Sequence, residues 1–113
     1  LYLINLDCED KVVDVKVDGT LIWKNFELGQ KASLLLPRKV NVSGVTIVKS
    51  TAEITGVEEN EIHFALTQTE DEIWLQTMRE VLPGEDYTVT VDGAITIVRS
   101  KCGRSKEIVI KLR

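Results

Sequence analysis

The sequence alternates between apolar and polar residues over most of its length. The pattern is clearest from Val12 to Pro37, where Val13 to Val17 alternate with charged residues and Asp18-Gly19 follows. Such alternation is typical of a strand with one buried face, and Asp-Gly supplies the positive φ angles that a two-residue hairpin turn needs. The stretch therefore predicts a strand, a tight turn, a return strand from Leu21, and a further strand from Lys31 to Leu36.

Similar alternation continues along the rest of the chain. Leu1 to Asp7 is mostly apolar, and a second Asp-Gly pair, Asp92-Gly93, separates two more alternating runs. A bulge is expected at Gly56, which interrupts an otherwise regular run. The pattern predicts further strands at 44–57, 62–66, 87–91, 95–97 and 108–112.

One stretch carries the signals of a helix instead. Thr69 with Glu72 three residues later is a capping-box signature, and Pro83-Gly84 is a typical helix stop. Between them, apolar side chains recur at helical spacing, at Trp74, Met78, Val81 and Leu82. This stripe predicts an amphipathic helix over about 69–82 whose apolar face packs on the sheet.

Together these elements predict a mainly β fold. We expect an antiparallel β barrel or closed sandwich in a single domain, 1–113, because closure removes the free edges of many short strands. The barrel and the helix would occupy 12–82, and 85–113 would add further β strands. The side chains expected to be buried together in the core are Val13, Val15, Leu21, Leu34, Leu36, Ile47, Ile62, Phe64, Leu66, Trp74 and Met78.

Composition narrows the class of protein. Of the 113 residues, 43% are hydrophobic and 28% are charged, as in ordinary globular domains, and the net charge is −4. This balance argues against nucleic-acid binding, and no apolar run reaches the roughly 20 residues that span a membrane. We expect no nucleic-acid partner, no membrane insertion and a cytoplasmic location. Cys8 and Cys102 are expected to be reduced, at least one of them in the core, while a disulfide between them stays an alternative.

Charge is unevenly distributed along the chain. Residues 53–72 contain seven acidic side chains and no lysine or arginine, whereas 99–113 contain six basic side chains and one acidic. Two explanations stay open. These segments are solvated strand faces and loops, or a basic edge meets an acidic partner or the acidic face of another copy.

The residue types needed for catalysis do not gather in a known pattern. There is no phosphate-binding glycine loop, and the single histidine, His63, alternates onto the face away from the core. No nucleophile, base or metal ligand follows at a recognisable spacing. The sequence therefore predicts no enzyme activity, no catalytic residue and no metal site.

The first hairpin carries a pattern known from one family. Asp14-Val15-Lys16-Val17-Asp18-Gly19 resembles the Asp-x-Ser-x-x-Gly signature of PilZ domains, bacterial receptors for cyclic di-GMP. The run 29–37 is similar to the family's Gly-x-x-apolar-x-Leu-x-Leu-Pro strand, and 42–49 to its Val-x-Gly-x-Val-Val strand. The run 62–66 with the predicted helix is similar to its Ile-x-Phe-x-x-Leu ending. The resemblance covers about 12–82.

The resemblance implies a ligand site at Asp14, Lys16 and Gly19, with two departures from the family. Lysine stands at position 16 where the family has serine, and the family's Arg-x-x-x-Arg pair is absent from 1–14. Those arginines hold the ligand's phosphates and guanines with bidentate bonds, and the family's spacing would place them upstream of Leu1. Binding of cyclic di-GMP is therefore expected to be weak or absent in this chain, and no other cofactor is implied.

The leading hypothesis is a PilZ-like regulatory or interaction module of a bacterial protein. It would act through contacts with a protein partner or with further copies of itself. The alternative is a purely structural β domain of a larger surface or assembly protein, with no small-molecule ligand.

Overall fold

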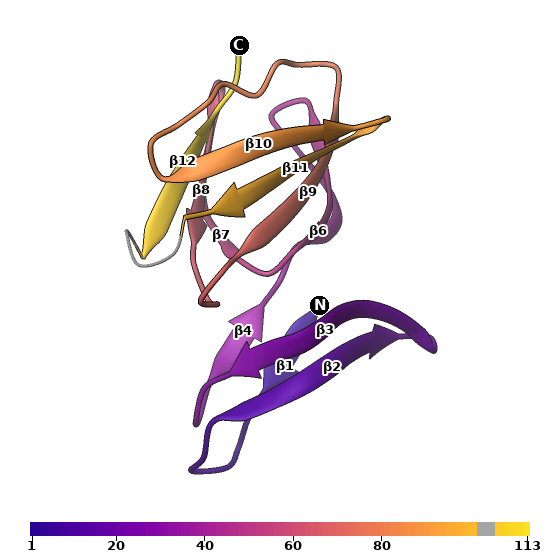
Figure 1. Ribbon diagram of the computed structural model, residues 1–113, viewed down its shortest axis with the longest axis vertical. Coiled ribbons are helices and arrows are strands. Elements are labelled where there is room, and N and C mark those ends of the chain that lie inside the picture. Colours follow the sequence, from indigo (N-terminus) through magenta and orange to yellow (C-terminus); the bar gives the residue numbers. More distant parts are fainter. Residues whose placement is uncertain (102–105) are drawn as a thin grey trace. The chain divides into compact units, whose positions relative to one another are not determined.

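The computed structural model describes residues 1–101 and 106–113, in which the chain forms two compact units, Leu1–Leu35 and Leu36–Arg113 (Figure 1). Each paired strand runs antiparallel to its neighbours. The described residues form no helix, and therefore none that is long and apolar enough to cross a membrane. The mainly β character predicted from the alternation is confirmed.

The N-terminal unit contains two separate two-stranded ribbons. In one, β1 (Tyr2–Ile4) pairs with β4 (Ser33–Leu35), and in the other, β2 (Lys11–Val17) pairs with β3 (Thr20–Leu28). The predicted hairpin turn is confirmed, with φ of 50° at Asp18 and 79° at Gly19. Glycine adopts this conformation without steric cost, which explains its place in the turn.

Apolar side chains and one amide hold the N-terminal unit together. The buried residues of its strands are Val15, Trp23, Phe26 and Leu28. Asn5 is also buried, and its Nδ2 donates to the carbonyl oxygens of Glu9, Leu28 and Gly29 at 2.8, 3.2 and 3.0 Å. One amide therefore ties the segment after β1 to the end of β3.

The C-terminal unit consists of two sheets that share one core. The five-stranded sheet has the order β10-β11-β9-β6-β5, and the three-stranded sheet has the order β12-β8-β7. Core residues come from both sheets, including Ile47 and Leu75 from the first and Phe64 and Ile110 from the second. The strands are β5 (Arg38–Val42), β6 (Val45–Ser50), β7 (Glu53–Glu58), β8 (Glu61–Ala65), β9 (Glu72–Thr77), β10 (Tyr87–Asp92), β11 (Ile95–Ser100) and β12 (Glu107–Lys111).

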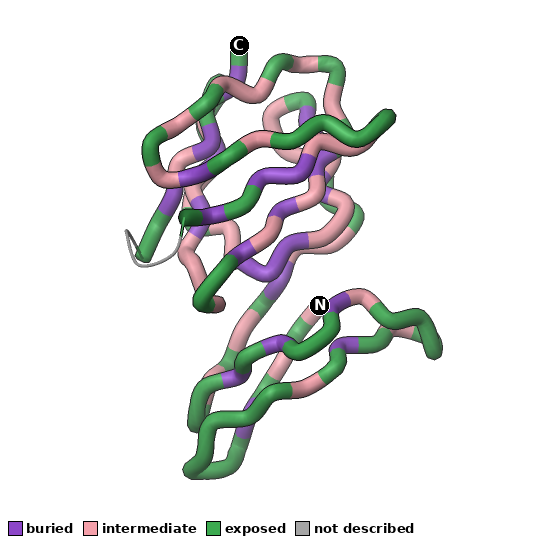
Figure 2. Tube along the Cα trace, in the orientation of Figure 1, coloured by how far each residue is buried: buried purple, intermediate pink, exposed green. Residues whose placement is uncertain are grey.

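Burial follows the alternation that the sequence displays (Figure 2). Of the residues predicted to be in the core, five are buried: Val15, Leu36, Ile47, Ile62 and Phe64. Four are half-buried: Val13, Leu34, Leu66 and Trp74. Two are exposed and were predicted wrongly: Leu21 and Met78.

The predicted helix over 69–82 is wrong, because this stretch contains strand β9. Ile73 and Leu75 are fully buried while Trp74 points to the opposite face. There the ammonium of Lys49 lies 4.1 Å from the centre of the Trp74 ring. Since β9 is hydrogen-bonded to β6 on one edge and β11 on the other, sheet pairing outweighs the local helix signals.

The expected closed barrel is also not observed, since no sheet among the described residues closes on itself. The stretch 12–82, expected to form one barrel and helix, is divided between the two units. Cys8 is exposed and free, whereas Cys102 lies outside the described residues.

Candidate functional site

The outer face of the three-stranded sheet gathers ionisable side chains. The register pairs Glu58 with Glu61, Glu61 with Lys111, and Gly56 with His63. Because Ile62 faces the core, its neighbours on β8, Glu61 and His63, face outward. The outward position of His63 agrees with the alternation.

Three of these side chains approach one another closely. His63 Nε2 lies 3.2 Å from Glu61 Oε2 and 3.8 Å from Glu58 Oε2. One ligand atom of each of the three residues lies within 4.8 Å of the others. The exposed fractions of the side chains are 36% for His63 and 35% for Glu61, so both remain accessible to a ligand.

Arg79 fixes the β7–β8 turn that carries the two glutamates. Its Nη1 donates to the carbonyl oxygens of Ser43 at 2.9 Å and Glu59 at 2.7 Å, and its Nη2 donates to Asn60 Oδ1 at 2.5 Å. Its Nε also donates to the carbonyl oxygen of Arg113 at 3.3 Å. One guanidinium thus joins two hairpin turns to the C-terminal segment.

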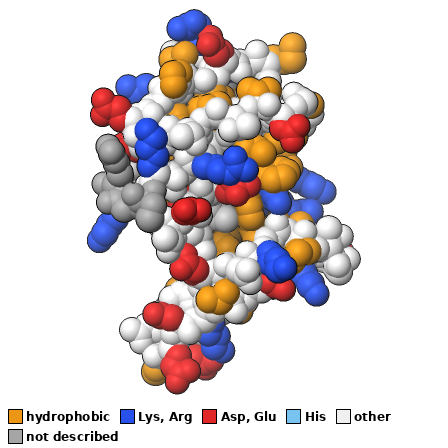
Figure 3. Space-filling view, viewed as in Figure 1, with side chains coloured by type: hydrophobic (Ala, Val, Ile, Leu, Met, Phe, Trp, Pro, Cys, Tyr) orange, Lys and Arg blue, Asp and Glu red, His pale blue; other side chains and the backbone are white. Residues whose placement is uncertain are grey.

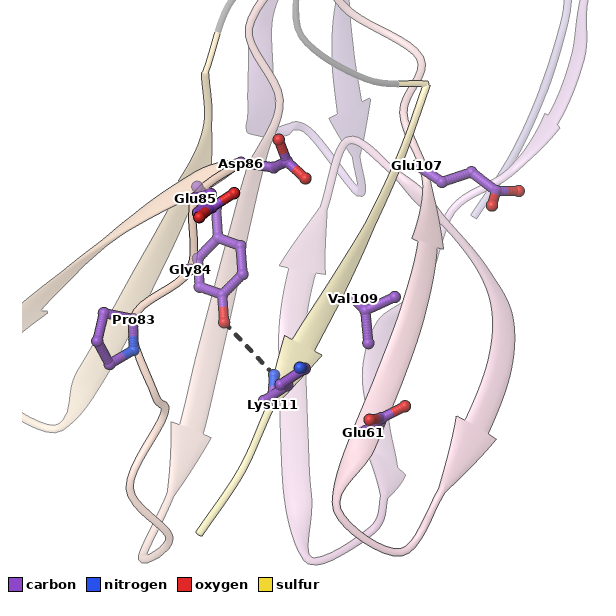
Figure 4. Close-up of a pocket in the computed structure, with 9 residues that line it drawn as sticks. Glu61, Pro83, Gly84, Glu85, Asp86, Glu107, Val109 and Lys111 are labelled. Carbon is purple, nitrogen blue, oxygen red and sulfur yellow. Dashed lines mark hydrogen bonds between the residues drawn. The ribbon is translucent and has the colours of Figure 1, made fainter.

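A groove of about 580 Å³ lies beside this cluster (Figure 4). Its walls come from β8, from the connection between β9 and β10, and from β12. Among its lining residues are four carboxylates and one lysine, namely Glu61, Glu85, Asp86, Glu107 and Lys111. At neutral pH these groups give the groove a net negative charge.

Tyr87 anchors the wall of the groove formed by the β9–β10 connection. The tyrosine is buried, its hydroxyl donates to the carbonyl oxygen of Leu82 at 2.6 Å, and it accepts from the backbone N–H of Lys111 at 3.4 Å. Burial raises the pKa of Tyr87, and the bond from Lys111 opposes that shift. A Cβ on Gly84 would lie 2.4 Å from the ring, so only glycine fits against it here.

The rest of the charge distribution is mixed. On the face of the C-terminal unit drawn in Figure 3, acidic and basic side chains lie side by side. Several form ion pairs, with Arg99 3.7 Å from Glu72 and Arg113 3.0 Å from Glu80. The basic and acidic segments noted in the sequence therefore meet within this chain at the pair of Arg99 and Glu72.

Asp71 is a second, differently built acidic position. Its buried carboxylate accepts from Thr51 Oγ1 at 2.8 Å, from the backbone N–H of Thr67 at 3.2 Å and from that of Gln68 at 3.1 Å. Its own backbone N–H donates to Ser100 Oγ at 2.8 Å. Burial raises the pKa of Asp71, and the hydrogen bonds from Thr51, Gln68 and Thr67 oppose the shift. With its oxygens occupied by donors from the chain, this carboxylate holds loops together.

The residues singled out by the PilZ-like pattern lie on the β2–β3 hairpin of the N-terminal unit. Asp14, Lys16 and Gly19 are all exposed. Asp14 Oδ1 accepts from the backbone N–H of Asn25 at 3.1 Å, near an irregularity in strand pairing. No heavy atom lies within 4 Å of an ideal Cβ on Gly19, so the backbone there is open to solvent.

Comparison with known proteins adds no family to this description. No protein-family model matches the chain, and no curated protein matches it. The chemistry of the site is therefore argued from its own residues.

Sequence reasoning found part of the site and missed the rest. It predicted the outward position of His63 and noted the acidic segment 53–72, but it assigned no role to Glu58. It missed Arg79 because the helix prediction covered that position. Only the register of the sheet brings Glu58, Glu61 and His63 together.

Proposed function

We propose that this chain is a non-catalytic interaction module whose C-terminal unit binds a cationic segment of a partner protein. The observation that carries the proposal is the groove, where carboxylates from three segments of the chain surround one space. Its volume of about 580 Å³ is in the range of typical ligand pockets. A lysine or arginine side chain complements such a lining, because opposite potentials steer association and fix register.

The backbone segments that carry the groove's carboxylates are held in place by hydrogen bonds. This order favours binding of a ligand over mere solvation of the acidic groups. Tyr87 fixes the connection that carries Glu85 and Asp86 through its hydroxyl, and Glu61 and Glu107 are carried by paired strands. A ligand would therefore meet carboxylates on ordered backbone, and less conformational entropy would be lost on binding.

The test uses a fluorescently labelled hexalysine peptide and the whole chain, in buffer with EDTA. Fluorescence anisotropy should give saturable binding that weakens as salt rises. The double variant Glu85→Lys and Asp86→Lys should bind about tenfold or more weakly, since each lost exposed ion pair contributes up to about 1 kcal/mol and reversal adds repulsion.

The matched control is the double variant Glu59→Lys and Glu70→Lys. Both side chains are exposed and neither lines the groove, and the change in net charge is the same. An equal loss in both variants would mean that only net charge attracts the peptide. Absence of saturable binding would favour the purely structural β domain.

A second proposal concerns the N-terminal unit, as part of a regulatory module of a bacterial cytoplasmic protein. It rests on the resemblance at Asp14, Lys16 and Gly19 and on the open backbone at Gly19. Without an arginine clamp, the charge-assisted bonds to a dianionic ligand would be few. We therefore propose that cyclic di-GMP binds weakly or not at all here.

A further inference from the structure

We propose that Glu58, Glu61 and His63 form a binding site for one divalent transition-metal ion, with Zn²⁺ as the probe. The site goes beyond the proposed peptide groove, although Glu61 belongs to both. Each residue offers one ligand atom, and the three atoms lie within 4.8 Å of one another.

The spacing of the ligand atoms suits a tetrahedral ion. Bonds of about 2.0–2.1 Å from zinc place neighbouring ligand atoms about 3.3 Å apart. Here His63 Nε2 lies 3.2 Å from Glu61 Oε2 and 3.8 Å from Glu58 Oε2. Small rotations of the exposed Glu58 side chain and the half-buried Glu61 side chain would therefore complete the three-ligand geometry, leaving a fourth position for water or another donor.

The donor set selects the class of metal. Imidazole nitrogen suits zinc, copper and nickel, whereas calcium and magnesium prefer oxygen donors alone. A site of one histidine and two carboxylates therefore favours a transition-metal ion. Its exposed position predicts moderate affinity, because the ligands are partly hydrated before the ion binds.

The sheet register supplies a separate argument for a cation. Glu58 and Glu61 are directly opposite across β7 and β8, and like charges in such a pair destabilise a sheet. Lys111 lies opposite Glu61 on the other side, but β7 is an edge strand among the described residues, so no further strand places a cation opposite Glu58. A bound divalent ion would offset the repulsion between the two carboxylates.

The backbone beneath the site is held in place. Arg79 donates to the carbonyl oxygen of Glu59 and to Asn60 Oδ1, the two residues of the turn between the glutamates. His63 lies opposite Gly56, and an ideal Cβ there would be 3.6 Å from the His63 Cβ and Cγ. The imidazole therefore lies over a glycine, with no bulky cross-strand neighbour on that side.

The experiment titrates ZnCl₂ into the whole chain by isothermal calorimetry and follows the imidazole resonances by ¹H–¹⁵N NMR. His63 is the single histidine, so its signals need no assignment. Cys8 and Cys102 are replaced by serine in every sample, because thiolates bind zinc strongly. We expect one zinc per chain with a Kd at or below about 100 μM, with movement of the His63 signals.

Variants separate the site from other surface carboxylates. His63→Ala should weaken zinc binding by about tenfold or more, since even outer-sphere partners of a metal contribute that much, and Glu58→Gln and Glu61→Gln should each weaken it. Glu59→Gln is the control, because its side chain lies in the same turn but outside the cluster. Mg²⁺ at the same concentrations should leave the His63 signals in place.

Three results would overturn the proposal. These are no saturation up to 1 mM zinc, saturation without movement of the His63 signals, or an equal loss of affinity in Glu59→Gln. The NMR measurement uses the chain with its native histidine, so it decides the matter even where His63→Ala lowers stability. Failure here leaves the hexalysine test untouched, since that test is run in EDTA.

Discussion

Replacing Asp71 with alanine would remove a buried carboxylate that joins two connections of the C-terminal unit, the one between β6 and β7 and the one between β8 and β9. The carboxylate accepts from the Thr51 hydroxyl and from the backbone N–H groups of Thr67 and Gln68. Alanine cannot accept a hydrogen bond, so these three donors would lose their partner in a place where Asp71 itself is only 1% exposed. Each such bond contributes about 1 kcal/mol net.

We therefore expect Asp71→Ala to lower the free energy of unfolding by about 3 kcal/mol at neutral pH. The estimate balances two effects that act in opposite directions. Removing a buried charge relieves its desolvation cost, whereas leaving donors unpaired costs about 1–3 kcal/mol each. Urea unfolding followed by circular dichroism measures the difference. Glu70→Ala is the matched control, since the neighbouring side chain is exposed and its loss should change stability by no more than about 0.5 kcal/mol.

The pH dependence of the same position gives an independent check. Burial raises the pKa of Asp71 in the folded chain above its ordinary value. The folded state therefore binds more protons than the unfolded state between the two pKa values, and stability from this group falls as pH rises through that interval. The free energy of unfolding of wild type minus that of Asp71→Asn should decrease as pH rises from about 3.9, the usual aspartate pKa. A difference that instead grows with pH would mean that the carboxylate is favoured by folding, and would refute the reasoning.

Three further changes test the core, the groove and the N-terminal hairpin. Phe64→Ala should cost about 3–5 kcal/mol in urea unfolding, because the side chain is fully buried, whereas Val57→Ala at a 46% exposed position should cost far less. Gly84→Ala should lower the melting temperature, since the new Cβ would meet the buried Tyr87 ring at 2.4 Å, while Gly29→Ala, with no heavy atom closer than 3.9 Å, should not. Calorimetry with cyclic di-GMP should show no saturable binding at tens of micromolar, an affinity that corresponds to a binding free energy of roughly −6 to −7 kcal/mol. Lys16→Ser alone should not create such binding. Micromolar binding by the unmodified chain would mean that Lys16 contacts a phosphate.

Short-range turn chemistry made the hairpins predictable. Asp18-Gly19 adopts the positive φ angles that its sequence favours, and β2 and β3 follow as expected. At the second Asp-Gly pair the turn lies one residue later, because Asp92 still pairs with Ile95 and Gly93 begins the turn. The turn at Ser43-Gly44 was missed, although Ser-Gly is a turn dipeptide and both residues have positive φ.

The wrong helix prediction for 69–82 also has a physical explanation. The stripe from Trp74 to Leu82 fits a helix, but Ile73 and Leu75 fit a strand equally well, and a short stretch cannot distinguish the two periods. Pairing with β6 and β11 decides between the two structures. Both of these strands are distant from β9 in sequence, so a local pattern cannot reveal the pairing. Met78 then points to solvent, because it follows the end of the strand.

The candidate site could be predicted only in part for a related reason. His63 faces outward by alternation alone, whereas its contact with Glu58 depends on the irregular pairing between Ile54 and Gly56. A bulge changes the register by one residue, and the sequence marks its place without giving its exact pairing. The groove also needs β12 beside β8, a pairing across some forty residues of chain.

Glu58→Gln offers a test in which stability and metal binding should change in opposite directions. The substitution removes the like charge opposite Glu61, so in EDTA at pH 8 it should stabilise the chain by about 0.2–1 kcal/mol. The same change removes one of three ligand atoms, so with zinc the stabilisation of wild type by bound metal should exceed that of the variant. Thermal melts of both proteins with EDTA and with zinc measure the two effects, and Glu59→Gln in the same turn provides the control. If Glu58→Gln instead lowers the melting temperature in EDTA, Glu58 is held by an attractive contact with His63, 3.8 Å away, and the repulsion argument fails.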